Sequence, residues 1–218
     1  ERAETTREVR ELAAWLDVKR PARQQLSDLA GQHPAASNYY AAFDHAWRTR
    51  RQQAIDADLV TWPENAVDFL PIPRFGHRLA DVFPWPRYRG FLPFADCGSC
   101  QVFVPPCDPA LPPDAQDAIL RQTNDTRIGL DFAIRIGGLG RHLQCAGASR
   151  ATARVGRIAG AEGAIRPFWF CAGTLVDGWA TYSTELMEES GALTDLQRLS
   201  EAQHRVRLAA RAVADTAI

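Results

Sequence analysis

Two segments of the sequence carry residue types and spacings that can do chemistry. The first runs from Ile134 to Gln144, reads IRIGGLGRHLQ, and contains Arg135, Arg141 and His142. A positioned histidine is a common general acid or base near neutral pH. A guanidinium can bind a carboxylate or a phosphate through two parallel hydrogen bonds. This segment therefore offers proton transfer by His142 and binding of an anionic substrate by Arg135 and Arg141.

The second segment, Gly173 to Gly191, reads GTLVDGWATYSTELMEESG and adds a carboxylate and a phenol. Asp177 can take part in proton transfer. Tyr182 can face a cleft between the two segments and act there as a proton donor or oxyanion partner. Each group also has a purely structural interpretation. Asp177 can pair with one of the arginines, His142 can be an ordinary hydrogen-bonded helix residue, and Tyr182 can be a core tyrosine with a satisfied hydroxyl.

Composition excludes several classes of protein. The chain has 218 residues, a formal net charge of −1 and 23% charged residues, which argues against a nucleic-acid partner or an acidic membrane surface. Nothing near eighteen consecutive apolar residues appears, and the start ERAETTREVR does not resemble a signal peptide. We therefore expect a cytoplasmic protein with no membrane association.

The cysteines allow one other metal hypothesis. The chain has five of them, an odd number that fits reduced thiols. Cys97, Cys100 and Cys107 are close enough in sequence to offer three thiolates to zinc, but a structural site needs four ligands and no second pair follows at a usual spacing. We interpret these cysteines as small buried residues in a hairpin.

Apolar periodicity predicts helices in the first 60 residues. The spacing of apolar residues from Glu1 to Leu29 is typical of an amphipathic helix that Pro21 ends or restarts. A second helix is expected from about Ser37, as its N-cap, to about Ala57. Its aromatic stripe is interpreted as core.

The remaining chain divides into a proline-rich part, 61–113, and a helical part, 114–218. In the first part CQVFVPP predicts a strand of a hairpin whose turn is DCGS. In the second, a helix is expected from Pro113 or Asp114 through IGLDFAIRI, followed by helices near 141–157, 175–189 and 194–218. We predict one mostly α domain over 1–218 with a small β-hairpin insertion.

A family resemblance rests on four stretches. They are DLVTWPENAVDFLPIPRF, RIGGLGRHLQ, DGWATY and RLAARAVADTAI. The sequence resembles a bacterial family of unknown function that is built like zinc metallopeptidases, with the signature H-E-x-x-P-G-H-H-L-Q followed by E-G-W-A-x-Y. The resemblance implies a metallopeptidase-like helical domain. It also implies that Arg211 and Asp215 lie near the site, although the simplest interpretation of these two is a helix-surface pair.

The departures from that signature fall on the positions that carry chemistry. Arginines, an isoleucine, a leucine and an aspartate replace the metal ligands, the general base, the proline and the downstream glutamate, at Arg135, Ile136, Leu139, Arg141 and Asp177. A guanidinium cannot be deprotonated in a protein and repels a dication, and isoleucine cannot activate water. We therefore expect no bound metal and no cofactor.

Two hypotheses of different kinds follow, and a third is weaker. The first is a metal-independent enzyme that acts by acid/base chemistry on a small anionic molecule, in a cyclisation, isomerisation, dehydration or condensation of secondary metabolism. In it His142, Asp177 and Tyr182 transfer protons, and Arg135, Arg141 and Arg211 bind the substrate. The second is a non-catalytic relative that binds a ligand or a protein partner. The third is a zinc peptidase with unusual ligands.

Overall fold

The computed structural model describes residues 22–77, 87–90, 99–160 and 173–215. Most of the expected first helix lies outside these ranges. The expected hairpin turn DCGS, including Cys97, also lies outside them except for Ser99. Among the described residues, no helix is long and apolar enough to cross a membrane.

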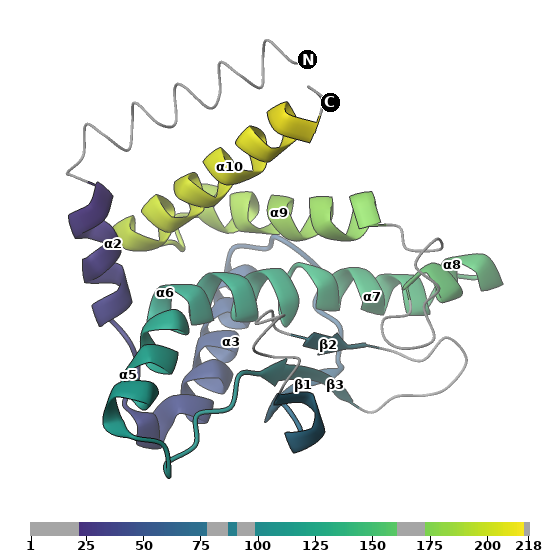
Figure 1. Cartoon of the computed structure of the whole chain (residues 1–218). Coiled ribbons are helices and arrows are strands. Elements are labelled where there is room, and N and C mark those ends of the chain that lie inside the picture. The colour runs from purple at the N-terminus through teal and green to yellow at the C-terminus, as the bar shows by residue number, and fades with distance from the viewer. Residues whose placement is uncertain (1–21, 78–86, 91–98, 161–172, 216–218) are drawn as a thin grey trace.

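The described chain is mostly helical, as predicted (Figure 1). Its helices are α2 (Ala22–Gly31), α3 (Tyr39–Asp56), α5 (Pro113–Gln122), α6 (Asp125–Arg127), α7 (Arg141–Ser149), α8 (Arg154–Gly160), α9 (Gly173–Glu189) and α10 (Asp195–Asp215). Two short 3₁₀ turns, η1 (Ala36–Asn38) and η2 (Arg74–Gly76), and a π-helix, η3 (Ile128–Ile136), complete the helical elements. In Figure 1, α9 and α10 lie on one side of the long line formed by α6, η3 and α7, and the sheet lies on the other.

The sheet has one strand more than the predicted hairpin. Its order is β1-β3-β2, with bounds Ala66–Pro71 for β1, Ser99–Val104 for β3 and Arg87–Arg89 for β2. β2 pairs antiparallel with β3, as a hairpin requires, whereas β1 pairs parallel with β3. The parallel pairing was not predicted, because AVDFLP contains an aspartate and a proline and shows no strong alternation.

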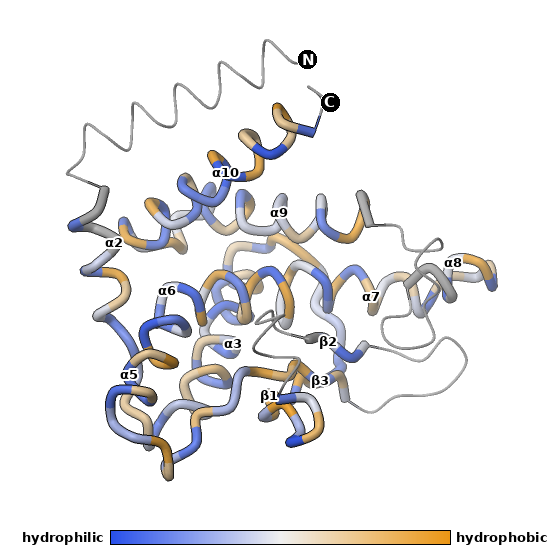
Figure 2. The backbone as a smooth tube through the Cα atoms, viewed as in Figure 1, coloured by the Kyte–Doolittle hydropathy of each residue, from blue (hydrophilic) through white to orange (hydrophobic). Residues whose placement is uncertain are grey.

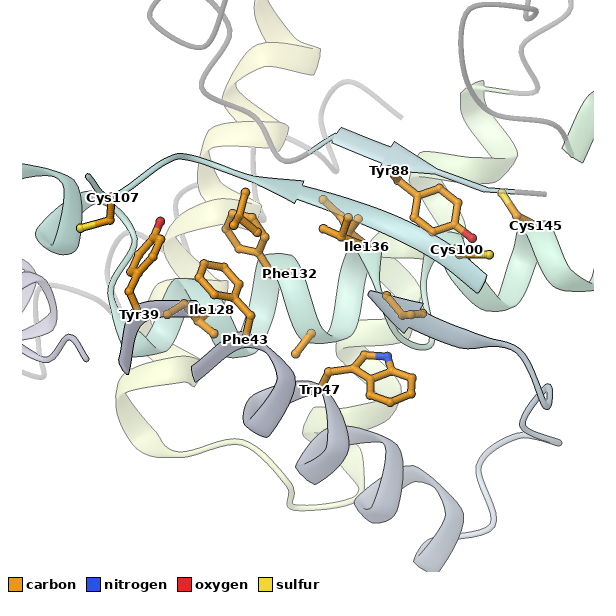
Figure 3. Close-up of a cluster of buried hydrophobic side chains, with 14 of the residues drawn as sticks. Tyr39, Phe43, Trp47, Tyr88, Cys100, Cys107, Ile128, Phe132, Ile136 and Cys145 are labelled. Carbon is orange, nitrogen blue, oxygen red and sulfur yellow. The ribbon is translucent and has the colours of Figure 1, made fainter. Parts of the chain in front are cut away.

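The core lies between α3, η3 and the sheet (Figure 3). Of the predicted aromatic stripe, Phe43 and Trp47 are buried on one face of α3, and Tyr40 and Ala46 pack partly buried against the same core, which confirms that the stripe is core. Phe43 packs edge-to-face on Phe132 of η3, with ring centroids 4.8 Å apart. This packing fixes η3 against α3 and so positions the segment that carries Arg135.

The predicted helix from Pro113 to Ile136 is wrong as a single element. It begins at Pro113 but breaks at Thr123, and the Asn124 side chain then accepts a hydrogen bond from the Arg127 backbone N–H at 3.0 Å. Asparagine is a strong N-cap, so α6 and η3 start again here in a new direction. The predicted N-cap at Ser37 is also wrong, because Asn38 precedes α3 and Ser37 lies within η1.

The turn between α9 and α10 is held by a capping box and a buried arginine. Thr194 and Gln197 exchange backbone-to-side-chain hydrogen bonds of 3.1 and 3.3 Å, the pattern expected for a threonine followed three residues later by glutamine. Arg50 of α3 donates to the carbonyl of Ala192 and to Gln197 Oε1, both at 2.6 Å. These contacts orient the start of α10, the helix that carries Glu201 and Arg205.

Candidate functional site

The segment that joins η3 to α7 is a buried turn, Gly137 to Gly140. Two tryptophans from different helices hold its carbonyl groups: Trp47 of α3 donates to Gly137 at 2.6 Å, and Trp179 of α9 donates to Leu139 at 2.7 Å. Because indole N–H groups are donors only, each of these contacts satisfies one buried carbonyl. The turn therefore connects α3, η3, α7 and α9 at one point.

Glycine is required in this turn for space. A Cβ on Gly138 would collide with the carbonyl oxygen of Ala133, and a Cβ on Gly140 would collide with that of Arg135. Both obstacles are backbone atoms, which cannot move without disturbing η3. These glycines interrupt the helix, and the close approach of two backbone segments is the physical reason that no larger residue fits.

The π-helical geometry of η3 determines where Arg135 lies. The backbone N–H of Gly137 donates to the carbonyl of Phe132, five residues earlier, at 2.8 Å. Arg135 lies in the last turn of this π-helix and faces α10, where it binds Glu201.

Arg135 is bound on two sides by carboxylates of the protein itself. Its Nη1 donates to Asp131 at 2.5 Å and its Nη2 to Glu201, whose side chain is only 1% exposed. Glu201 also accepts from Arg205, which in turn donates to Glu188 at 2.8 Å. The predicted substrate-binding Arg135 is thus part of an internal ion network, and its partners are Asp131 and Glu201, not Asp177.

Arg141 and Asp177 are brought together, as the sequence interpretation of an ion pair between the two segments predicts. The Arg141 Nη2 donates to Asp177 Oδ1 at 2.5 Å, with side-chain exposures of 31% and 67%. The pair joins the N-terminus of α7 to the first turns of α9. Tyr182 lies on the same helix, is 46% exposed and packs beside Trp179 with ring centroids 5.8 Å apart. Its alternative interpretation as a core tyrosine is wrong.

His142 points to the opposite side, into the core beneath the sheet. It is fully buried, and its Nδ1 lies 3.1 Å from the hydroxyl of Tyr88 on β2. Burial lowers the pKa of His142 to about 4, and a hydrogen bond to the Asn65 backbone opposes this shift only in part. The imidazole is therefore neutral at pH 7.

The buried imidazole predicts a specific dependence of stability on pH. Because the folded-state pKa of His142 is depressed, the unfolded chain binds more protons between about pH 6.5 and pH 4, so stability is lost as the pH falls through this window. We expect His142 alone to contribute about 3 kcal/mol to this loss. Urea unfolding from pH 4 to pH 7 should show a shallower slope for His142→Gln than for the wild type, and equal slopes would contradict the prediction. Burial lowers the pKa of His204 too, so the slope for His204→Gln is the comparison that shows how much of the pH dependence comes from this second histidine.

Arg211 lies away from these groups. It is exposed on α10 and forms a long ion pair of 3.7 Å with Asp215, one helical turn later. The interpretation as a helix-surface pair fits this contact, and none of the described residues links Arg211 to Arg141 or Asp177. Two partners were not predicted from the sequence: Glu201, which binds Arg135, and Tyr88, which contacts His142. Glu201 carries one weak local signal, an i,i+4 spacing to Arg205.

The donor set does not fit a catalytic zinc ion. Within the described part of the chain, no group of three or more His, Cys, Asp or Glu side chains could hold a metal. The chemistry of the positions agrees with this, because guanidinium groups stand at Arg135 and Arg141, and His142 and Asp177 face different partners. We derive no step through a metal. Cys100 and Cys107 are buried residues of β3 and the loop after it.

Comparison with known protein families gives a match that spans α7 to α10 but begins after Arg135. No curated protein and no solved structure matches the chain. Residues 140–218, which begin at the last glycine of the turn and include α7 to α10, match a family model described as "Bacterial protein of unknown function (DUF885)". This stretch contains Arg141, His142, Asp177 and Tyr182, whereas Arg135 lies before it. Over α7 to α10 the chain is therefore similar to that bacterial family.

Proposed function

We propose that this chain is a non-catalytic, metal-free domain on a metallopeptidase-like scaffold, and that it binds a protein partner. One observation carries the proposal: the polar side chains at the motif positions each bond to other groups of the same molecule, although the buried Arg135 Nε makes no hydrogen bond. Arg135 binds Asp131 and Glu201, Arg141 binds Asp177, and His142 contacts Tyr88. The contacts of Arg135 support packing, because they compensate the buried carboxylate of Glu201, whereas the Arg141–Asp177 pair is partly exposed.

The state of His142 also favours a structural role. A general acid or base has to come within hydrogen-bond reach of the proton that it transfers. His142 is fully buried, and with a pKa of about 4 it is a weak base at neutral pH. Acid/base chemistry by this residue would require the contact with Tyr88 to open.

The competing hypothesis is the metal-independent enzyme acting on a small anionic molecule. One observation favours it: the Arg141 and Asp177 pair is partly exposed, and the exposed Tyr182 lies on the same helix as Asp177. A substrate carboxylate or phosphate could replace Asp177 at the guanidinium. The two hypotheses differ in whether Arg141 is available to small anions.

A thermal-shift experiment separates these hypotheses. The full chain is heated with a panel of small dicarboxylates, tricarboxylates and sugar phosphates at millimolar concentration, beside Arg141→Met. A ligand that binds only the folded state stabilises it and so raises Tm. At a ligand concentration a hundred times Kd, the free energy of unfolding increases by about 2.7 kcal/mol. The non-catalytic domain should give no rise that depends on Arg141. A rise in the wild type that disappears in Arg141→Met would instead establish an anion site and support the enzyme.

The metal-free part of the proposal has its own test. We expect the purified protein to carry no stoichiometric zinc, and a chelator to leave its Tm unchanged, because Arg135, Ile136 and Arg141 stand where ligands and the base would be needed. Elemental analysis of protein prepared with zinc in the medium provides the measurement. A value near one zinc per chain would overturn this expectation and revive the peptidase hypothesis.

A further inference from the structure

The stretch between Asp131 and Glu162 contains no acidic residue. Its five arginines fall into two groups. Arg135 and Arg141 are engaged by carboxylates, as described above. The other three follow α7 and enter α8, at Arg150, Arg154 and Arg157. We call residues 150–157 the basic tip.

The arginines of the basic tip have no carboxylate within ion-pair distance among the described residues. Arg150 and Arg154 are exposed, and neither makes a side-chain hydrogen bond there. Arg157 is half-buried and donates from Nε to the carbonyl of Ala151 at 2.6 Å, which holds α8 against the end of α7. Two other surface arginines, Arg48 and Arg121, pair with an aspartate four residues away. The tip therefore carries a local charge that the described protein does not neutralise.

An exposed apolar side chain follows Arg154 directly in the sequence. Val155 is 73% exposed, more than any other large aliphatic residue described. Figure 2 shows α8 at one end of the molecule, with hydrophobic and hydrophilic residues side by side along it. Cations that flank an apolar side chain suit a partner with acidic groups around an apolar residue, since charge complementarity selects and orients the partner while apolar contact adds affinity.

We propose that the basic tip docks an acidic segment of a protein partner, with Arg150 and Arg154 binding its carboxylates and Val155 packing on an apolar side chain between them. The inference rests on the proposed partner-binding function and names the surface that carries it. Arginine suits this role because its planar guanidinium binds a carboxylate through two hydrogen bonds.

Charge and size favour an acidic protein segment over other polyanions. The whole chain has 26 acidic and 25 basic residues. The chain as a whole therefore offers no excess positive charge to a nucleic acid that extends beyond the tip. An anionic membrane would need a larger apolar face than Val155 offers.

The test measures binding of the full chain to a fluorescein-labelled peptide in which aspartate and glutamate flank a leucine, by fluorescence anisotropy. The double variant Arg150→Ala/Arg154→Ala removes the two exposed arginines that make no side-chain hydrogen bond or ion pair within the described residues. We expect it to bind the peptide roughly tenfold more weakly, and Val155→Ser to bind it severalfold more weakly. The control Arg48→Ala/Arg121→Ala changes the net charge equally on other surfaces and should bind within about twofold of wild type.

Each alternative outcome has a defined meaning. Absence of peptide binding, or an equal loss in the control variant, overturns the basic tip as a docking surface. Tighter binding to phosphatidylserine vesicles or duplex DNA that depends on Arg150 and Arg154 overturns the assignment to an acidic protein. If catalysis is found while peptide binding and its dependence on the tip persist, the non-catalytic function fails and the docking surface stands.

Discussion

Gly138→Ala and Gly140→Ala should each destabilise the fold by about 3 kcal/mol or prevent folding, because a new Cβ would overlap a backbone carbonyl of η3. The colliding atoms belong to Ala133 and Arg135, and moving them would break the packing of η3 against α3. The free energy of unfolding in urea is the measurement, with circular dichroism to check that the variant is folded at the start.

Two other helical glycines provide a matched control. Gly147 in α7 and Gly178 in α9 have nothing within 4 Å of an added Cβ. Alanine there should raise stability by about 0.5–1 kcal/mol, because alanine has the higher helix propensity. If Gly138→Ala behaves like Gly178→Ala, the close approach of the two backbone segments does not determine the residue at this turn.

Arg135→Met should cost about 2–3 kcal/mol, since it removes the cation shared by Glu201 and Asp131 and leaves Arg205 and Arg127 as their remaining cations. Glu201 is the critical partner, because its side chain is only 1% exposed and water cannot replace the guanidinium. Methionine keeps much of the side-chain volume, so the loss measures charge more than packing. Urea unfolding at pH 7 gives the value.

A second-site variant separates charge from packing. In Arg135→Met/Glu201→Gln the buried carboxylate that lost Arg135 becomes a neutral amide, so part of the lost stability should return and the two changes should be strongly non-additive. Arg211→Met is the surface control. Its pair with Asp215 is long and exposed, so we expect a change of less than about 0.5 kcal/mol. Equal effects at Arg135 and Arg211 would contradict the internal ion network.

Local patterns predicted much of this structure. The aromatic stripe of α3, the start of α5 at Pro113 and the helical nature of the region after 113 follow from apolar spacing and proline placement. The pairing of Arg141 with Asp177 was predicted from charge, since a guanidinium at one motif segment needs a carboxylate from the other.

Features that depend on tertiary contacts were not predictable in this way. Nothing in IGLDFAIRI distinguishes a π-helix from an α-helix, although the difference decides that Arg135 faces α10. The partner of Arg135 lies 66 residues away, and the partner of His142 lies 54 residues away. Contacts over such separations produce no periodic pattern of residues from which they could be predicted. The catalytic and substrate-binding roles assigned to these residues stay predictions.

The two indoles that hold the glycine turn have a consequence for the order of folding. Trp47 is separated from Gly137 by 90 residues, and Trp179 from Leu139 by 40, so both hydrogen bonds close long loops. Loop closure costs conformational entropy before the contact is gained. The turn gains both hydrogen bonds only after α3 and α9 have packed against it. We therefore expect Trp47→Phe and Trp179→Phe to increase the unfolding rate far more than they decrease the folding rate.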